Sequence, residues 1–243
     1  MFSTLNIGKT GLKTMQFKMD SIADDLANSN TNGYKRKDIS FQELLNNAEI
    51  SAGSKASVGK VNFSQGTLIE SPFDYHMSIE GNGFFGVIDE NNNLMLTRNG
   101  GFHINENYTI SDDSGYPLVV DYNVPVEEWT SENVVISSNG DITTSDDNPV
   151  ILGKVVLFNP ENLDSLTSLG EGRYLPSGNV DLYDSINAPE MFGDIIQHSL
   201  EGSNVDIITS MADMISTQRA YSLNAKAIQT TDEIMNLING IKR

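Results

Sequence analysis

The sequence has no cysteine and no long apolar run, and both absences exclude whole classes of protein. Without thiols the chain cannot form disulfides, thiolate nucleophiles or zinc–thiolate sites. No stretch of about 18 consecutive apolar residues occurs, so we expect no membrane-spanning helix. Residues 1–16 lack a basic start followed by a continuous apolar core, and we therefore expect no cleaved signal peptide.

Basic residues are also scarce. The 243 residues include 15 Lys and Arg against 33 Asp and Glu, which gives a formal net charge of −18. Nucleic acids and anionic membranes favour an excess of Lys and Arg, so neither is expected as a partner. The acidity is confined to residues 46–198, because residues 1–45 carry a net charge of +1 and residues 199–243 one of −1. Near-neutral ends around an acidic centre indicate two kinds of structure.

The N-terminal region has the apolar pattern of an amphipathic helix. Its apolar residues recur at spacings of three, four or seven, which is the a/d seam of a heptad repeat with Gly8 in the one remaining position. The seam ends at the Asn- and Gly-rich stretch 28–33, which is a strong helix terminator. The predicted seam residues are Leu5, Leu12, Met15, Met19, Ile22 and Leu26.

A second helix is predicted near the C-terminus, where residues 206–239 contain neither Gly nor Pro. Ser203 or Asn204 suits its N-cap and Gly240 its end. Both apolar stripes are narrow, which favours helix–helix packing, and we expect them to face each other within or between subunits. The alternative is that each helix covers the core of its own domain. The predicted C-terminal seam residues are Met211, Met214, Gln218, Tyr221, Ala225, Ile228, Met235 and Ile238.

Between the helices the apolar period changes to two, which indicates β-strands. Short β-prone runs alternate with turn signals, and the pair Asn139-Gly140 between two such runs is the clearest hairpin signal. Residues 46–60 are rich in Ala, Ser, Gly and Asn and are interpreted as a loop or linker. We therefore predict an α+β fold. Long N- and C-terminal α-helices pair as a discontinuous coiled-coil-like domain, and the central domain is mainly antiparallel β.

The predicted domain boundaries follow from these changes of period and charge. A discontinuous terminal helical assembly domain combines residues 1–30 with 203–243. An extended or linker region covers residues 31–70, and the acidic β-rich domain covers residues 71–200. We expect the surface of the acidic domain to be well hydrated.

Several short motifs suggest chemistry, but each lacks the context that the chemistry needs. Residues 81–86 have the letters of the dinucleotide-binding motif GxGxxG, yet strand and turn residues follow where a helix must begin. We therefore expect a turn with glycines at positive φ, which places Phe84 and Phe85 in a sheet. Residues 89–93 begin like a calcium loop, but Leu94 stands where the glycine of that loop must be.

Catalytic and metal sites are not expected either. His76, His103 and His198 show no metal-ligand spacing, and the Ser-x-x-Lys motif at residues 57–60 lacks its partner motifs. Carboxylates are too abundant in this chain for an acidic pair to indicate glycoside hydrolysis. The basic triplet at residues 35–37 is interpreted as a solvated patch. We predict no catalytic residue, no cofactor and no metal ion, and hence no enzyme.

Longer stretches resemble one known family. Residues 24–35, DDLANSNTNGYK, are similar to the N-terminal signature of bacterial flagellar rod and hook proteins. Three further stretches resemble the C-terminal signature of the same family: LEGSNV at 200–205, QRAY at 218–221 and IQTTDE at 228–233. Both signatures lie in the predicted terminal domain or at its boundary.

The central region resembles the β-domain motifs of the same family. These motifs are EGNGFF at 80–85, TRNGGF at 97–102 and SGYPL at 114–118, and they occur in the family's order. Residues 121–195 match only loosely. The matched residues of the central motif are Gly81, Gly83, Phe84, Phe85, Arg98 and Gly100.

The resemblance implies a structural subunit of the flagellar basal-body rod, closest to the distal rod protein. Such a subunit self-assembles through its terminal helices into the axial tube that transmits motor torque to the hook and filament. The implied partners are copies of itself, other rod and hook proteins and the flagellar type III export apparatus, without nucleic acid or membrane insertion. The implied location is the basal body, outside the cytoplasm. The motif residues implied to turn the chain out of the tube are Asn28, Asn30, Thr31, Gly33 and Tyr34.

Three departures from the family pattern leave other positions along the axial structure open. Asp24-Asp25 replaces the usual Asn pair, and Ser222 stands where the family often has Glu after its Ala-Tyr. The stretch from Phe41 to Leu68 is also shorter than is usual in distal rod proteins. A hook or proximal-rod subunit is therefore the alternative within the family. The alternative from another class is a secreted β-domain enzyme or carbohydrate-binding module with a helical dimerisation hairpin. That alternative requires a concave pocket with perturbed carboxylates.

Overall fold

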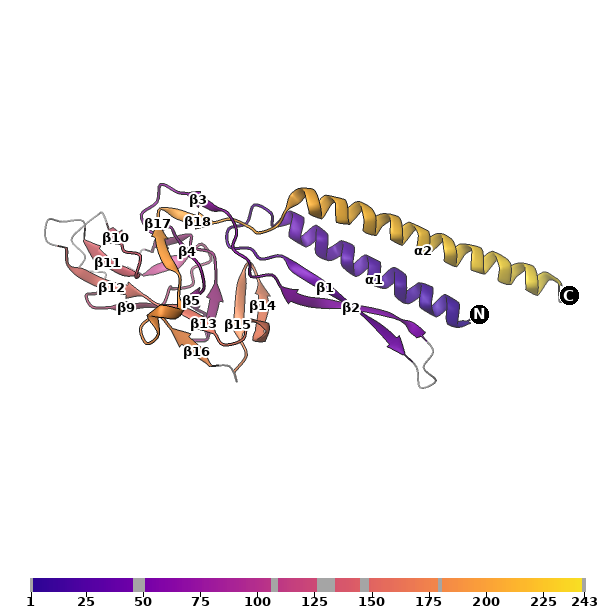
Figure 1. The fold of residues 1–243 in the computed structure, drawn as a ribbon, viewed down its shortest axis with the longest axis horizontal. Helices are drawn as coiled ribbons and strands as arrows, with labels where there is room; N and C mark the ends of the chain where they lie inside the picture. Colours follow the sequence, from indigo (N-terminus) through magenta and orange to yellow (C-terminus); the bar gives the residue numbers. More distant parts are fainter. Residues whose placement is uncertain are drawn as a thin grey trace. The chain divides into compact units, whose positions relative to one another are not determined.

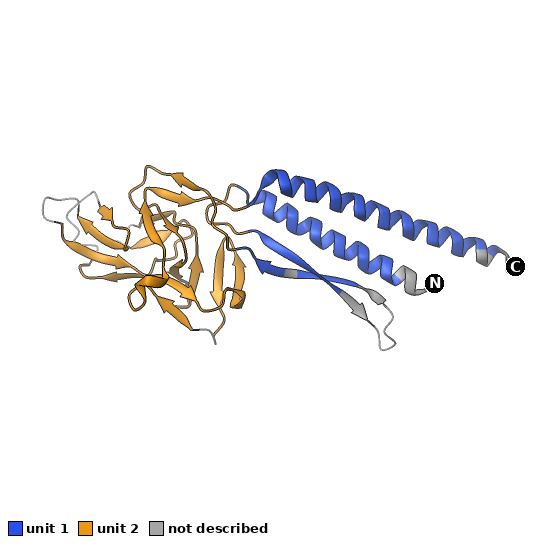
Figure 2. Ribbon diagram, in the orientation of Figure 1, with its two compact units in different colours: residues 1–29, 36–62, 205–243 blue, residues 30–35, 63–204 orange. Residues whose placement is uncertain are grey.

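The computed structural model describes residues 2–45, 51–105, 109–125, 134–144, 149–178 and 181–241. It has the predicted α+β fold, with two long terminal helices in contact with each other and antiparallel sheets between them in the sequence (Figure 1). The chain divides into two units (Figure 2). Unit 1 comprises residues 1–29, 36–62 and 205–243, and unit 2 comprises residues 30–35 and 63–204. None of the helices in the described ranges is long and apolar enough to cross a membrane.

Unit 1 consists of two helices and a β-hairpin. Its elements are α1 (Phe2–Ala27), β1 (Lys37–Leu45), β2 (Ser51–Val61) and α2 (Ile207–Ile241). Helix α1 lies between α2 and the hairpin and contacts both (Figure 1). Helix α1 ends just before Asn28, at the terminator that the sequence indicates.

The hairpin differs from the domain plan that the sequence suggests. Residues 51–61, interpreted as part of a loop or linker over 46–60, form a full strand that pairs antiparallel with β1. Ala, Ser and Gly make β2 poor in apolar residues, which explains the linker-like pattern. The strand is held to α1 by hydroxyl groups, since Thr14 Oγ1 donates to the Ser54 carbonyl oxygen at 3.2 Å. Residues 46–50 lie outside the described ranges.

Helix α2 begins later than its predicted N-cap. The Asp206 carboxylate caps it, because Oδ1 accepts from the backbone N–H groups of Ile208 at 2.9 Å and Thr209 at 3.3 Å. The predicted caps, Ser203 and Asn204, precede the helix and belong to unit 2. At the other end α2 continues through Gly240, so this glycine does not terminate the helix as predicted. Gly240 is not among the residues with positive φ, and it therefore keeps the helical backbone.

Unit 2 is built from short antiparallel strands. In the described residues they are β3 (Leu68–Glu70), β4 (Met77–Glu80), β5 (Phe84–Ile88), β6 (Leu94–Thr97), β7 (Phe102–Ile104), β8 (Ile110–Asp112), β9 (Val120–Tyr122), β10 (Val134–Ile136), β11 (Asp141–Thr144), β12 (Ile151–Val155), β13 (Leu157–Pro160), β14 (Leu166–Gly170), β15 (Arg173–Pro176), β16 (Leu182–Asp184), β17 (Asp194–Gln197) and β18 (Ser199–Glu201). Two 3-10 helices, η2 (Leu163–Ser165) and η3 (Pro189–Met191), follow β13 and β16.

These strands form several small sheets. The largest has the order β14-β15-β6-β5-β13-β16, and a second has the order β10-β11-β12-β9. Strand pairs β17–β4, β18–β3 and β7–β8 complete the unit in the described ranges. One apolar core joins these sheets apart from the β18–β3 pair, and in it the Phe85 and Phe102 rings meet edge to face with centroids 5.3 Å apart.

Two turn predictions in unit 2 are confirmed. Strands β10 and β11 pair as a hairpin around Asn139-Gly140, and Gly140 has a φ of 86°. In the GxGxxG stretch, Gly81 and Gly83 have φ values of 117° and 123°, and strand β5 begins at the next residue, Phe84. The stretch is therefore a strand connection and has no helix N-terminus to hold a pyrophosphate.

Candidate functional site: helix surfaces and a buried charge cluster

Helices α1 and α2 of unit 1 are antiparallel and closely packed at a glycine. A Cβ atom added to Gly8 would lie 2.8 Å from Cγ1 of Ile228, whereas one added to Gly11 would lie 3.6 Å from Nδ2 of Asn224. Moving forward along α1 therefore means moving backward along α2. The missing side chain at Gly8 makes room for Ile228, which is the knob-into-hole contact of a coiled coil.

The structure brings most of the predicted seam residues of α1 to this packed region. Ile22 is buried, at 8% exposure, and the side chain of Leu5 lies outside the described part. The remaining α1 seam residues are half-buried: Leu12, Met15, Met19 and Leu26.

On α2 the residues that face inward differ from the predicted seam at every second position. Met211 and Gln218 of the predicted seam are exposed, and Ser210 and Thr217 are buried at 3% exposure each. The sequence pattern favoured apolar residues, whereas a close helix contact favours small ones. We define the inner stripe as Ser210, Met214, Thr217, Tyr221, Asn224, Ile228, Thr231 and Met235, which steps strictly by four and three. Ala225 is half-buried beside it, and the side chain of Ile238 lies outside the described part.

A second apolar stripe runs along the opposite face of α2. Ile208 is 81% exposed and Leu223 is 68% exposed. At about 100° per residue these positions lie roughly half a turn away from the inner stripe. We define the outer stripe as Ile208, Met211, Ile215, Leu223, Ile234 and Leu237, all of them exposed. Exposed apolar surface of this extent marks an interaction site, and of its residues the sequence pattern had indicated only Met211.

A cluster of three charged residues is buried in unit 2. Lys35 and Glu201 form an ion pair, with both side chains fully buried. Arg98 Nη1 approaches the other carboxylate oxygen of Glu201 at 3.2 Å. Burial lowers the pKa of Lys35, while its hydrogen bond and attraction to Glu201 act in the opposite direction. Burial also lowers the pKa of Arg98, again opposed by Glu201.

Further hydrogen bonds hold Lys35, Arg98 and Glu201 in place. Lys35 Nζ donates to the Ser64 carbonyl oxygen at 2.8 Å, and the Gly66 N–H donates to Glu201 Oε1 at 2.9 Å. Arg98 Nη2 donates to the Gly81 carbonyl oxygen at 2.7 Å. The cluster therefore fastens segments from the beginning, middle and end of unit 2 to one another.

Three of the family-like motifs meet in this cluster. Lys35 ends the N-terminal motif, Arg98 belongs to the motif at 97–102, and Glu201 belongs to the motif at 200–205. The N-terminal motif requires glycine at position 33 for two reasons. The φ of Gly33 is 69°, and an added Cβ would lie 2.3 Å from the backbone nitrogen of Asn99. The sequence pattern gave no sign that these charges are paired, because the partners lie far apart in the chain.

The other motif residues occupy structural positions in turns and sheets. Tyr34 is buried, and its N–H donates to the Thr31 carbonyl oxygen at 3.3 Å, while Asn28 Nδ2 donates to the Asp24 carbonyl oxygen at 2.9 Å. Asn30 is exposed.

In the central motif, the Phe84 ring lies 5.1 Å from the Arg98 guanidinium carbon, in a cation–π contact. Gly100 lies against β4, where its carbonyl oxygen accepts from the Met77 N–H at 3.1 Å. Phe85 is fully buried in the core of unit 2.

The interpretation of residues 35–37 as a solvated patch is wrong. Lys35 is buried as described, and its neighbours pair within unit 1. Arg36 Nη2 lies 3.6 Å from Asp213, and Lys37 Nζ lies 2.8 Å from Asp24. The backbone N–H of Lys37 also donates to the buried Asp25 at 3.3 Å, so the acidic pair that replaces the usual Asn pair has cationic and N–H partners.

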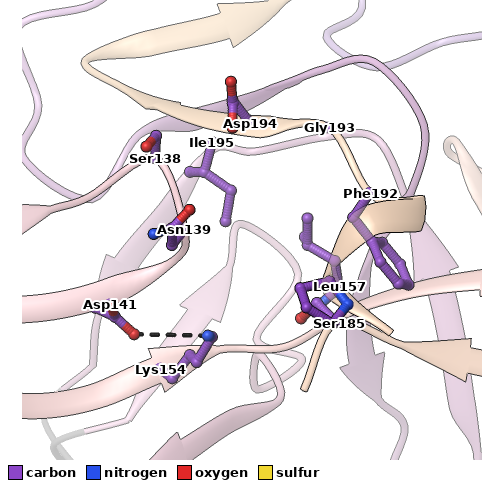
Figure 3. Close-up of a pocket in the computed structure, with 11 residues that line it drawn as sticks. Ser138, Asn139, Asp141, Lys154, Leu157, Ser185, Phe192, Gly193, Asp194 and Ile195 are labelled. Carbon is purple, nitrogen blue, oxygen red and sulfur yellow. Dashed lines mark hydrogen bonds and ion pairs between the residues drawn. The ribbon is translucent and has the colours of Figure 1, made fainter. Parts of the chain in front are cut away.

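Unit 2 also contains a polar cleft of about 230 Å³ (Figure 3). Asp141 and Lys154 form an ion pair of 3.7 Å in its wall, and Asp194 and Ser138 lie above them in the view. Over the described ranges no group of three or more His, Asp or Glu residues is arranged to hold a metal ion. Asp89 of the calcium-like loop instead accepts from the Asn93 side-chain amide at 3.0 Å and from the backbone N–H groups of Asn93 and Asn91, both at 2.8 Å, and these bonds hold the pKa of Asp89 below its usual value.

Two family models match the chain. One is described as "Flagellar basal body rod FlgEFG protein C-terminal" and matches residues 196–241. The other is described as "Flagellar hook protein FlgE/F/G D1 domain" and matches residues 78–144. The first match covers β18 and α2, and the second covers the strands around Arg98.

Full-length relatives carry matching names. The flagellar basal-body rod protein FlgG of Buchnera aphidicola subsp. Schizaphis graminum is 32% identical, with 98% of this chain and 99% of the relative covered. FlgG of Borreliella burgdorferi is 28% identical over the full length of both chains. The flagellar hook-basal body complex protein FlhP of Bacillus subtilis is 29% identical, also over both full lengths.

These matches span both units, and so they include the helices as well as the charge cluster. They agree with the prediction of a structural, non-enzymatic protein, because they name rod and hook components. The chain belongs to the flagellar basal-body rod protein family.

Proposed function

We propose that this chain builds the rod by self-assembly, with the outer stripe of α2 as the main contact between subunits. Family membership makes the chain a FlgG-like subunit of the axial structure, located in the hook-basal body complex with other axial proteins. We further propose that the chain binds copies of itself and the flagellar type III export apparatus, and that the assembled rod transmits motor torque.

The observation that carries the proposal is the unpartnered outer stripe. Ile208, Ile215 and Leu223 expose 81%, 53% and 68% of their surfaces on a helix whose other face already packs on α1. Full burial of an aliphatic side chain contributes about 1.5–3 kcal/mol, so several such residues supply enough free energy for association. In an isolated subunit the outer stripe stays exposed to water, whereas in a polymer it is buried between subunits.

Several relatives named FlgG support a position in the axial structure like that of FlgG. Relatives with this name match from organisms as different as Buchnera aphidicola and Borreliella burgdorferi. In Bacillus subtilis, however, FlgG and FlhP are each 29% identical to this chain. We propose the distal rod, and a proximal-rod or hook position is the alternative. Cryo-electron microscopy of isolated basal bodies that carry a tagged subunit decides between them by the height of the tag along the axis.

Sedimentation over a concentration series tests self-assembly. The wild-type chain is expected to form polymers above a critical concentration, and the paired substitutions Ile215→Lys and Leu223→Lys are expected to abolish them. Asp232→Lys is the matched control, since it changes the charge by the same two units and Asp232 is exposed on α2 but lies off the outer stripe. Normal polymers from the double variant would show that the outer stripe is not the contact. A wild-type chain that stays monomeric at every concentration would reject self-assembly altogether.

A further inference from the structure

Unit 1 contains an apolar groove with basic residues beside it. The groove lies where α1 meets β2 and has a volume of about 300 Å³. Phe17 and Ala56 supply apolar surface, and Lys13 and Lys55 are exposed lining residues. Within the described residues neither lysine has a carboxylate partner. The groove therefore suits an apolar side chain that is accompanied by negative charge.

The two units differ sharply in charge. Unit 2 holds 23 of the 33 acidic residues but only four of the 15 basic ones, which gives it a formal charge of −19. Unit 1 therefore has a formal charge of +1. Lys35 and Arg98, two of the four basic residues of unit 2, are buried in the charge cluster. In a polymer, unit 2 of one copy is electrostatically attracted to a basic surface on unit 1 of another.

One loop of unit 2 has the chemistry that the groove requires. Phe73 is 61% exposed, which is the largest exposure of any aromatic side chain among the described residues. Glu70 and Asp74 lie on either side of it in the sequence.

The loop is held in place before any contact forms. The Ser71 N–H donates to the His198 carbonyl oxygen at 2.8 Å, and Gln197 Nε2 donates to the Asp74 carbonyl oxygen at 2.8 Å. The Phe73 ring rests against the His76 ring at 4.8 Å. Presenting an exposed aromatic ring on an ordered loop lowers the entropy cost of docking.

We propose that the loop of residues 70–74 in one copy of this chain docks into the α1–β2 groove of a second copy. Phe73 enters the apolar part beside Phe17, and the carboxylates of Glu70 and Asp74 face Lys13 and Lys55. This contact rests on the proposed self-assembly and is distinct from the outer stripe of α2. It gives each subunit a polar, salt-sensitive contact in addition to the apolar one.

Charge reversal tests the contact. Lys13→Glu with Lys55→Glu is expected to raise the critical concentration by roughly tenfold or more, as expected for the loss of close charge pairs between proteins. Adding Glu70→Lys and Asp74→Lys to the same chain is expected to restore assembly. Lys9→Glu is the matched control, since Lys9 is exposed on α1 but does not line the groove. Loss of assembly without restoration would overturn the choice of loop, and no effect of reversal would overturn the contact.

A cysteine pair gives an independent readout, because the chain has no cysteine of its own. Lys55→Cys and Glu70→Cys, which leave Phe73 in place, are introduced into two differently tagged chains, which are mixed, allowed to polymerise and oxidised. A disulfide between the two tags is expected in the polymer, and its absence in a normal polymer would overturn the inference while leaving self-assembly intact. Failure of the wild-type chain to polymerise would overturn both.

Discussion

Lys35 and Glu201 lie 166 positions apart in the sequence and form an ion pair whose side chains are both fully buried. Arg98 reaches the same carboxylate from a third segment. Taking charges out of water is costly and is offset only when each is paired and hydrogen-bonded. Unit 2 is therefore fully folded only when its first and last segments are in contact. Both segments lie next to the points at which the chain passes into unit 1.

The first prediction concerns the carboxylate of this cluster. Glu201→Gln keeps the shape of the side chain but leaves Lys35 and Arg98 buried without a negative partner. We expect the free energy of unfolding of unit 2 to fall by about 3–5 kcal/mol, which is typical of breaking a buried pair. Urea unfolding followed by near-UV circular dichroism of the aromatic core measures the change.

An exposed ion pair is the control for this experiment. Asp141 lies 3.7 Å from Lys154 in unit 2, and both side chains are partly solvated. Asp141→Asn is therefore expected to change the free energy of unfolding of unit 2 by at most about 1 kcal/mol. Equal effects of Glu201→Gln and Asp141→Asn would mean that burial of the cluster contributes nothing.

The second prediction concerns truncation. A chain that ends at Asn204 retains β18 and Glu201, whereas one that ends at His198 loses both. We expect unit 2 of the longer chain to unfold cooperatively in urea and unit 2 of the shorter chain to lose cooperativity, since Lys35 and Arg98 then have no carboxylate. If both truncated chains unfold with the same sharp transition, β18 is not an integral part of unit 2.

The helices, their periods and the hairpin at Asn139-Gly140 could be predicted, because each depends on residues close together in the sequence. The charge cluster could not, since the spacing of Lys35 and Glu201 along the chain carries no information about their distance in space. The motifs that contain these residues can be recognised in the sequence. The burial and pairing of their charges appear only when the segments of Lys35, Arg98 and Glu201 come together in the fold. The basic triplet was misinterpreted for the same reason.

Two other differences have local causes. The sequence of β2 has the pattern of a linker because small residues lower its apolar content, although the same small residues let α1 approach. On α2 the sequence pattern chose Met211 over its neighbour Ser210, because apolar residues are the usual guide to a buried face. A small polar residue nevertheless fits a buried helix position, and Ser210 is 3% exposed.

The third prediction concerns the glycines of α1. An exposed helical Gly→Ala change stabilises a helix by about 1 kcal/mol, and Gly11→Ala should approach this gain because its Cβ makes only an ordinary contact. Gly8→Ala should be less favourable by about 1–3 kcal/mol, because the Ile228 side chain must move. Far-UV circular dichroism during thermal unfolding compares the two variants. Ile228→Ala should remove the difference between them, and a difference that persists would place the strain elsewhere.

The last prediction concerns acid and the N-terminus of α2. Hydrogen bonds from Thr209 and Ile208 hold the pKa of Asp206 below its usual value, because they favour the ionised carboxylate. A lowered pKa in the folded state means that the stabilisation is fully present above the unfolded pKa of about 3.9 and is lost as the pH falls through the lower folded value. The protection factors of the Ile208 and Thr209 amides, which correct the hydrogen exchange measured by NMR for its intrinsic pH dependence, should therefore fall in this acidic range. Asp206→Asn keeps a capping oxygen without a titrating group, so its exchange at these two amides should not show this acid-dependent change; an unchanged acid response would mean that another group controls the first turn.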